Sequence, residues 1–115
     1  MSESGDKARL ETILQLIEDI RFITRRHEGI KNALEDIEGH HSILMCLMQM
    51  GETLNKISSK TARESLPVDL AYKMRNIIAH DYLGVDDRII EKTIEKNLPT
   101  LEKEIKKTLN RLNAI

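Results

Sequence analysis

Apolar side chains recur every three or four residues along most of this 115-residue chain, the spacing that places them on one face of an α-helix. In the first stretch, about residues 6–26, these positions are Leu10, Ile13, Leu14, Ile17 and Ile20. We expect further long helices over about 38–59, from Pro67 into the segment near Tyr82, and from Asp86-Asp87 toward the C-terminus. A short helical piece, about 31–37, should bridge the first two.

The composition favours the same all-α class. Leu, Ile, Glu and Lys dominate, whereas the chain has only five Gly and two Pro. The length suits one domain, residues 1–115, and predicts an up-and-down bundle of four main helices with short connections. Pro99 should kink the last helix, because proline has no N–H and its ring clashes with the preceding turn.

The stretch from Ile43 to Met50 is apolar nearly all round the second long helix. Such a helix is buried on more than one side, and a single chain of this size buries only part of its surface. We therefore expect this helix to pack within the protomer and against a second copy, giving a homodimer. Gly51 costs about 1 kcal/mol relative to Ala in a helix interior, so another helix should pass close to its backbone.

Bulk properties exclude several classes of protein. A net charge of −1 and 3% aromatic residues argue against a global positive field or a base-stacking platform for nucleic acid, so any RNA contact needs a local patch, for which Lys73, Arg75 and Arg88 are candidates. No window approaches the roughly 20 apolar residues of a transmembrane helix, and the N-terminus does not read as a signal peptide. We expect a cytoplasmic protein whose one cysteine, Cys46, is a structural thiol.

The run Met74-Arg75-Asn76-Ile77-Ile78-Ala79-His80-Asp81-Tyr82 concentrates the reactive side chains. Arginine grips phosphate with two hydrogen bonds and histidine moves protons near neutral pH, which together could cleave a phosphodiester without a metal. On a helix, Arg75 and Tyr82 would lie about 20° apart, but Arg75 and His80 about 140° apart. Either the helix ends near His80 and the next turn re-aims the ring, or a second protomer brings its own motif to a shared cleft.

Each candidate also has a structural interpretation. A histidine in the last turn of a helix is favoured by the helix dipole, and Arg75 could be an ion-pair partner. His40 and His41 would point about 100° apart, which disfavours a shared metal ion. The run Arg25-Arg26-His27 stands at a helix C-terminus, where cations are expected whether or not they contact phosphate. Residues 58–66 are polar and read as a loop.

Three segments share their pattern with one family: the run from Met74 to Asp86, the run Met50-Gly51-Glu52 with Leu54 to Ser58 after it, and the run Asn97-Leu98-Pro99. They resemble the HepT-like proteins of the HEPN superfamily. Those proteins carry an Arg-x4-His-x-Tyr motif at a helix end, a Gly-Glu segment in the second helix and a later Leu-Pro segment. The resemblance covers roughly residue 40 to the C-terminus.

The resemblance implies a homodimeric HEPN-like helical bundle without a cofactor. It implies a metal-independent endoribonuclease, the toxin of a pair whose antitoxin is a small nucleotidyltransferase. Arg75 and His80 would be the catalytic pair, Asn76 and Asp81 supporting polar residues, and Tyr82 the hydroxyl that receives AMP and so silences the toxin. The alternative is a non-catalytic helical module that docks, or presents a nucleotide to, the nucleotidyltransferase. A purely structural helical dimer is a third interpretation.

Overall fold

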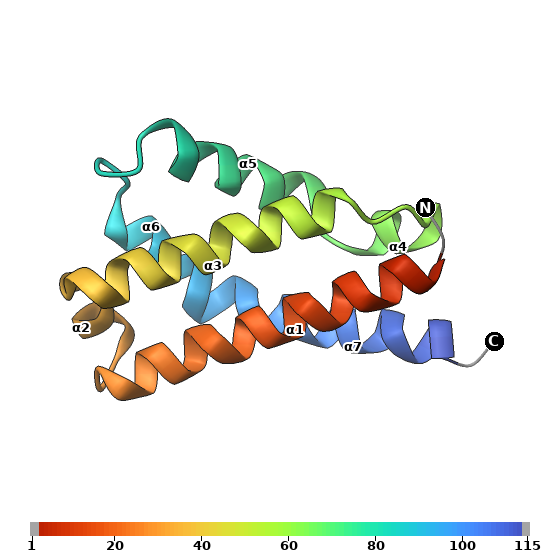
Figure 1. The fold of residues 1–115 in the computed structure, drawn as a ribbon, viewed down its shortest axis with the longest axis horizontal. Helices are drawn as coiled ribbons and strands as arrows, with labels where there is room; N and C mark the ends of the chain where they lie inside the picture. The colour runs from red at the N-terminus through yellow and green to blue at the C-terminus, as the bar shows by residue number, and fades with distance from the viewer. Residues whose placement is uncertain (1–2, 114–115) are drawn as a thin grey trace.

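The computed structural model describes residues 3–113, and every regular element within that range is helical (Figure 1). The elements are α1 Glu3–Arg26, α2 Ile30–Glu35, α3 Ile37–Asn55, α4 Lys60–Ser65, α5 Val68–His80, α6 Asp87–Lys92, the π-helical turn η1 Thr93–Asn97, and α7 Leu98–Asn113. The four long helices α1, α3, α5 and α7 run alternately up and down the long axis (Figure 1). The predicted all-α, up-and-down bundle is confirmed.

Helix α3 is the central element of the bundle. It packs along α1 on one side and along α5 on the other, while α7 lies along α1 (Figure 1). Its buried residues are Gly39, Ile43, Leu44, Leu47, Met50, Gly51 and Leu54. Two neighbours within the same protomer therefore account for most of the apolar circumference of α3. The apolar run from Ile43 to Met50 does not by itself require a second copy, although Met45 remains 50% exposed.

At Gly51, α3 and α5 approach each other closely. A Cβ atom at Gly51 would lie 2.6 Å from Cβ of Arg75 and 2.7 Å from the carbonyl oxygen of Ala71. Both distances are shorter than real contacts, so only glycine allows this spacing. The predicted close approach of another helix is confirmed, and it seats the base of the Arg75 side chain directly on the backbone of α3.

The polar stretch around residues 58–66 was expected to be a loop, and that prediction is wrong because the stretch contains α4. Its start is held by a distant partner: the buried carboxylate of Asp6 in α1 accepts hydrogen bonds from the backbone N–H groups of Ser58 and Ser59, both at 2.8 Å. Burial raises the pKa of Asp6, but these hydrogen bonds outweigh burial and hold the pKa below its ordinary value of 3.8.

The last helix bends just before Pro99, as the sequence predicts, and it does so through a π-helical turn. The wider turn η1 separates α6 from α7, and the chain changes direction there (Figure 1). One extra residue in the turn relieves the clash between the proline ring and the carbonyl group four residues earlier, and the absent N–H of Pro99 needs no partner.

Helix α5 buries less apolar surface than its pattern predicts. Ile78 is buried, but Leu70 is 58% exposed and Ile77 is 43% exposed, although the helical spacing of Leu70, Met74, Ile77 and Ile78 predicts one buried stripe. The reason is that α5 packs chiefly against α3. Its next face, with Leu70 and Met74, lines an apolar groove of about 480 Å³ shared with α3 and with the start of α7.

Candidate functional site

The motif lies at the end of α5, at the opposite end of the bundle from α4 (Figure 1). Helix α5 continues without a break to His80, and Asp81 is its C-cap residue. Arg75 and His80 therefore remain about 140° apart around the helix axis. Within residues 3–113, no hydrogen bond or ion pair joins the two side chains. One protomer on its own does not bring the predicted catalytic pair together.

Arg75 is held in place on three sides. Its Nε atom forms an ion pair with Oε1 of Glu52 in α3, at 2.5 Å. Its Nη1 atom donates a hydrogen bond of 2.9 Å to Oδ1 of Asn76. The guanidinium carbon lies 5.6 Å from the ring centre of Tyr72. Preorganised in this way, the guanidinium loses little further freedom when it binds an anion.

His80 and Asp81 behave differently from each other. The His80 side chain is exposed at the last residue of α5, where its positive form meets the negative end of the helix dipole. Asp81 folds back into the turn that follows, because its Oδ1 atom accepts a hydrogen bond of 3.1 Å from the backbone N–H of Gly84. Its contact in the protomer thus supports the shape of the turn, and His80 is free to face another molecule.

Tyr82 contacts the first turns of α3. Its hydroxyl oxygen lies 2.9 Å from Nδ1 of His41, and the two rings stack with centres 5.5 Å apart and planes 14° apart. His40 packs edge-on against both rings, and its Nε2 atom lies 3.2 Å from Oδ1 of Asp87 at the start of α6. The sequence pattern does not predict this cluster of His40, His41, Tyr82 and Asp87. The angle of about 100° between the two histidines on a helix bears only on a shared metal ion, which it disfavours.

Arg75 and Tyr82 flank one seam between α3 and the α5 region. The expected angular proximity of the two residues assumed a helix through Tyr82, but α5 ends before it. Their partners on α3, Glu52 and His41, are eleven residues apart, which places them about 20° apart around that helix and about 16 Å apart along it. The arginine and the tyrosine therefore mark two points along the same side of α3.

The other candidates have local partners. Arg88 pairs with Asp86 at 3.1 Å, and this contact raises the pKa of Arg88 and lowers that of Asp86. Lys73 is exposed on α5. In the cluster at the end of α1, the ring of His27 forms a hydrogen bond with the carbonyl oxygen of Ile23, and this bond is the main reason that the pKa of His27 is raised. His27 also pairs with Asp36 at 3.1 Å. These contacts favour a structural interpretation for His27.

Cys46 is half-buried, and burial raises its pKa to about 11, which fits a structural thiol. Within residues 3–113, no set of three His, Cys, Asp or Glu side chains is arranged to hold a metal ion. Over the same residues, no helix is both long and apolar enough to cross a membrane.

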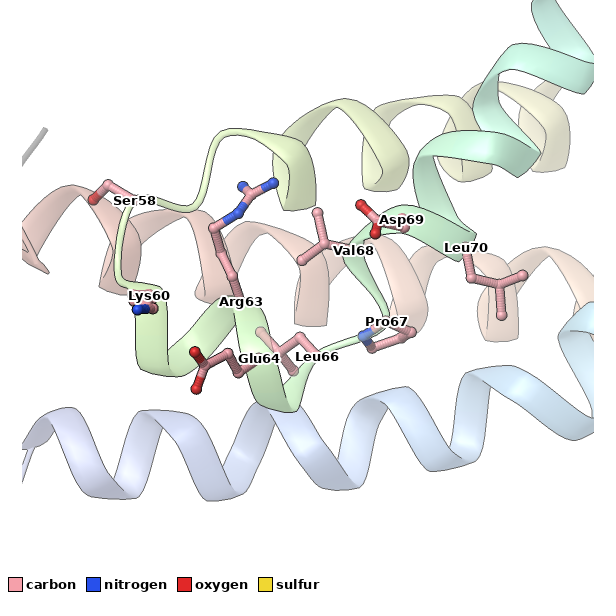
Figure 2. Close-up of a pocket in the computed structure, with 9 residues that line it drawn as sticks. All are labelled: Ser58, Lys60, Arg63, Glu64, Leu66, Pro67, Val68, Asp69 and Leu70. Atoms are coloured by element: carbon pink, nitrogen blue, oxygen red, sulfur yellow. The ribbon is translucent and has the colours of Figure 1, made fainter.

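A second hollow lies away from the motif. It measures about 630 Å³ and is formed where α4 leads into α5 (Figure 2). Its lining residues are Ser58, Lys60, Arg63, Glu64, Leu66, Pro67, Val68, Asp69 and Leu70. Arg63 is one of the two cationic residues in this lining. Its guanidinium donates hydrogen bonds to the carbonyl groups of Asn55 and Ile57 at the end of α3. In this hollow, Arg63 thus serves to hold α4 against the end of α3.

Comparison with known proteins agrees with the motif. The model of one protein family, described as "Ribonuclease HepT-like", matches residues 13–108 of this chain. "Putative RNase MJ1216" of Methanocaldococcus jannaschii is 30% identical over 95% of this chain and 91% of its own length. "Putative RNase TTE0752" of Caldanaerobacter subterraneus is 31% identical over 89% of this chain and 92% of its own length. "Probable ribonuclease HepT" of Thermococcus cleftensis is 29% identical over 88% and 93%. No solved structure matches the chain significantly. The chain belongs to the HepT-like ribonuclease family.

Proposed function

We propose that the chain is a metal-independent endoribonuclease in which Arg75 and His80 carry the chemistry. Membership of a ribonuclease family and the placement of both residues on the last turns of α5 support this proposal. His80 takes the proton from a ribose 2′-hydroxyl or gives one to the leaving 5′-oxygen. Arg75 stabilises the extra negative charge on the phosphorus in the transition state. The observation that carries the proposal is the guanidinium of Arg75, held by Glu52 and Asn76, with an exposed histidine five residues further along the same helix.

The active form is a homodimer with the two motifs near its two-fold axis. A single α5 keeps Arg75 and His80 on different faces, so a cleft that contains both needs one of each from the two chains. Exposed apolar side chains surround His80 in sequence: Ile77 is 43% exposed and Leu83 is 87% exposed. Covering such side chains is the usual driving force for association.

The toxin–antitoxin role is part of the same proposal. A small nucleotidyltransferase would act as antitoxin in the cytoplasm and transfer AMP to the hydroxyl of Tyr82. That hydroxyl lies in a half-buried side chain on the same side of α3 as the arginine. AMP there would add a negative phosphate and a bulky nucleoside to the seam that RNA must enter, and would weaken RNA binding by repulsion and by occupying space.

Cleavage of a labelled single-stranded RNA, measured with a chelator present, tests the ribonuclease proposal. The wild-type protein should cleave, whereas Arg75→Ala and His80→Ala should each lose activity by about 100-fold or more. Lys60→Ala serves as the control, because it removes an exposed cation at the start of α4, at the opposite end of the bundle from the motif (Figure 1). Equal cleavage by the wild type and both motif variants would refute the assignment.

A second candidate is a non-catalytic module that holds a nucleotide or the nucleotidyltransferase. The separation of Arg75 from His80 within one protomer favours it, since a phosphate-binding arginine needs no histidine beside it. Expression of the chain without its partner separates the two candidates. Growth arrest that depends on His80 supports the nuclease, whereas tight binding to a nucleotidyltransferase without growth arrest supports the module.

A further inference from the structure

The hydroxyl of Tyr82 is paired with a ring nitrogen that can accept its proton. We propose that His41 is the general base that activates this hydroxyl as a nucleophile toward the α-phosphorus of a nucleoside triphosphate. The inference rests on the proposed function in one respect, that Tyr82 is the residue that receives the nucleotide. It adds a residue, on a different helix and 41 positions away in sequence, that makes the transfer fast.

Geometry favours the His41 side chain as the proton acceptor. Oη of Tyr82 lies 2.9 Å from Nδ1 of His41, whereas the backbone carbonyl oxygen of His41 lies 3.4 Å away. The shorter contact lies within the normal range for hydrogen bonds and the longer one lies at its limit. A neutral imidazole with its proton on Nε2 presents Nδ1 as an acceptor, so the phenol donates to it.

The imidazole is also held in orientation. Stacking against Tyr82, with planes 14° apart, fixes the ring on one side, and the edge of His40, with ring centres 5.9 Å apart, fixes it on another. His40 is in turn tied to α6 through Asp87 at 3.2 Å. A nucleophile, an adjacent base and a third group that orients the base are the usual parts of an activated hydroxyl.

The transfer step balances without any further reactant than the nucleoside triphosphate. Oη of Tyr82 forms a bond to the α-phosphorus while the bond from that phosphorus to the bridging oxygen breaks. Pyrophosphate leaves with the electron pair, and the phenolic proton moves to Nδ1 of His41. A phenol is almost wholly protonated at neutral pH, so removal of its proton during attack is the part of the barrier that a positioned base lowers.

The chain offers an internal control in Tyr72, its second tyrosine. Tyr72 is also half-buried and lies beside a cation, Arg75, whose guanidinium carbon is 5.6 Å from the centre of its ring. Among the described residues, no hydrogen bond to a histidine is present at Tyr72, in contrast to Tyr82. A difference in reactivity between the two phenols therefore reports on the histidine contact rather than on exposure or on a nearby positive charge.

An aryl sulfonyl fluoride is the direct probe, because a phenol attacks its sulfur, fluoride leaves, and the phenolic proton needs a base. Modification of each tyrosine is followed by peptide mass spectrometry. In the wild type, Tyr82 should react at least about tenfold faster than Tyr72. In His41→Asn and His41→Gln, the Tyr82 rate should fall to that of Tyr72, whose own rate should not change and so reports an intact fold. Added imidazole should restore the Tyr82 rate in His41→Ala.

Equal rates for the two tyrosines in the wild type would overturn the role of His41, whatever happens in the variants. Retention of the fast Tyr82 rate in both folded His41 variants would also overturn it. His40→Asn is the neighbouring control and should leave most of the fast rate, since His40 does not contact the hydroxyl through a hydrogen bond.

A separate assay keeps this inference distinct from the function on which it rests. Purified wild type is incubated with α-labelled ATP and a small nucleotidyltransferase. No label on Tyr82, together with a fast sulfonyl fluoride reaction, would reject AMP transfer but leave the activated hydroxyl standing. Label on Tyr82 at the same rate in the wild type and in His41→Asn would reject the base and leave the proposed function standing.

Discussion

At the scale of single residues, polar side chains tie together parts of this bundle that are remote in the chain. Asp6 is the clearest case, because its buried carboxylate accepts the N–H groups of Ser58 and Ser59 and a hydrogen bond of 3.0 Å from the Ser58 hydroxyl. Arg75 is a second case, tied to Glu52 and Asn76. In both places the side chain links elements that are remote in the chain.

Asp6→Asn should destabilise the protein by about 1.5–3 kcal/mol at pH 7, the usual value of hydrogen bonds to a charged group. The folded-state pKa of Asp6 lies below its ordinary value of 3.8, so the carboxylate contributes its full stability above that pH and loses it as the pH falls through the lowered value. Urea unfolding at pH 7 and at pH 3 measures this effect. The difference in stability between wild type and variant should shrink at pH 3, and an unchanged difference would contradict the role of the charge.

The motif residues could be predicted from the sequence, but their contacts could not. Arg75, His80 and Tyr82 are close in the chain and their residue types point to chemistry. The partners Glu52 and His41 lie on another helix, and no local pattern pairs them with the motif. The angle predicted between Arg75 and His80 on an ideal helix was correct, because α5 is continuous between them. The angle predicted between Arg75 and Tyr82 does not apply, because the helix ends before Tyr82.

At the scale of elements, α3 sets the geometry of the site through its glycine. Gly51→Ala would ordinarily gain about 1 kcal/mol in a helix interior. Here the new methyl group would overlap Cβ of Arg75 and the carbonyl oxygen of Ala71, and overpacking of this kind costs about 1–3 kcal/mol. We expect a net loss of stability, and a fall in RNA cleavage because α5 and its arginine must move.

Gly5→Ala is the matched control for this prediction. The nearest atom to a Cβ at Gly5 is Nη1 of Arg9 at 2.9 Å, the end of a flexible side chain that can shift. Thermal unfolding should show a lower midpoint for Gly51→Ala and none of that loss for Gly5→Ala. A Gly51→Ala protein at least as stable as the wild type would contradict the tight contact between α3 and α5.

Element boundaries were predictable where apolar spacing was strong and failed where other interactions decided them. The long helices follow their stripes closely. Helix α4 was missed because its start depends on Asp6, which is more than 50 residues away. The bend before Pro99 was expected, but its π-helical form was not, since several local geometries can accommodate a proline ring.

At the scale of the whole molecule, the open side of the bundle is the face of α5. Leu70 and Ile77 on α5, and Leu83 in the turn after it, remain exposed. We expect the wild type to sediment as a dimer and Ile77→Asp to sediment as a monomer, because a buried, unpaired carboxylate at an interface is strongly unfavourable. Met45→Asp, on α3, and Phe22→Asp, on α1, change equally exposed apolar residues and should remain dimeric. A dimer that is broken by Met45→Asp and not by Ile77→Asp would place the interface on α3 instead.

The most direct test of the central proposal, a ribonuclease site made by two chains, is to mix Arg75→Ala with His80→Ala. The two variants are unfolded together and refolded, so that about half of the dimers contain one chain of each kind. Each mixed dimer keeps one intact arginine and one intact histidine, on different protomers. RNA cleavage should reappear in the mixture although neither variant cleaves alone. A refolded mixture that contains mixed dimers and remains as inactive as the separate variants would contradict a site shared across the two-fold axis.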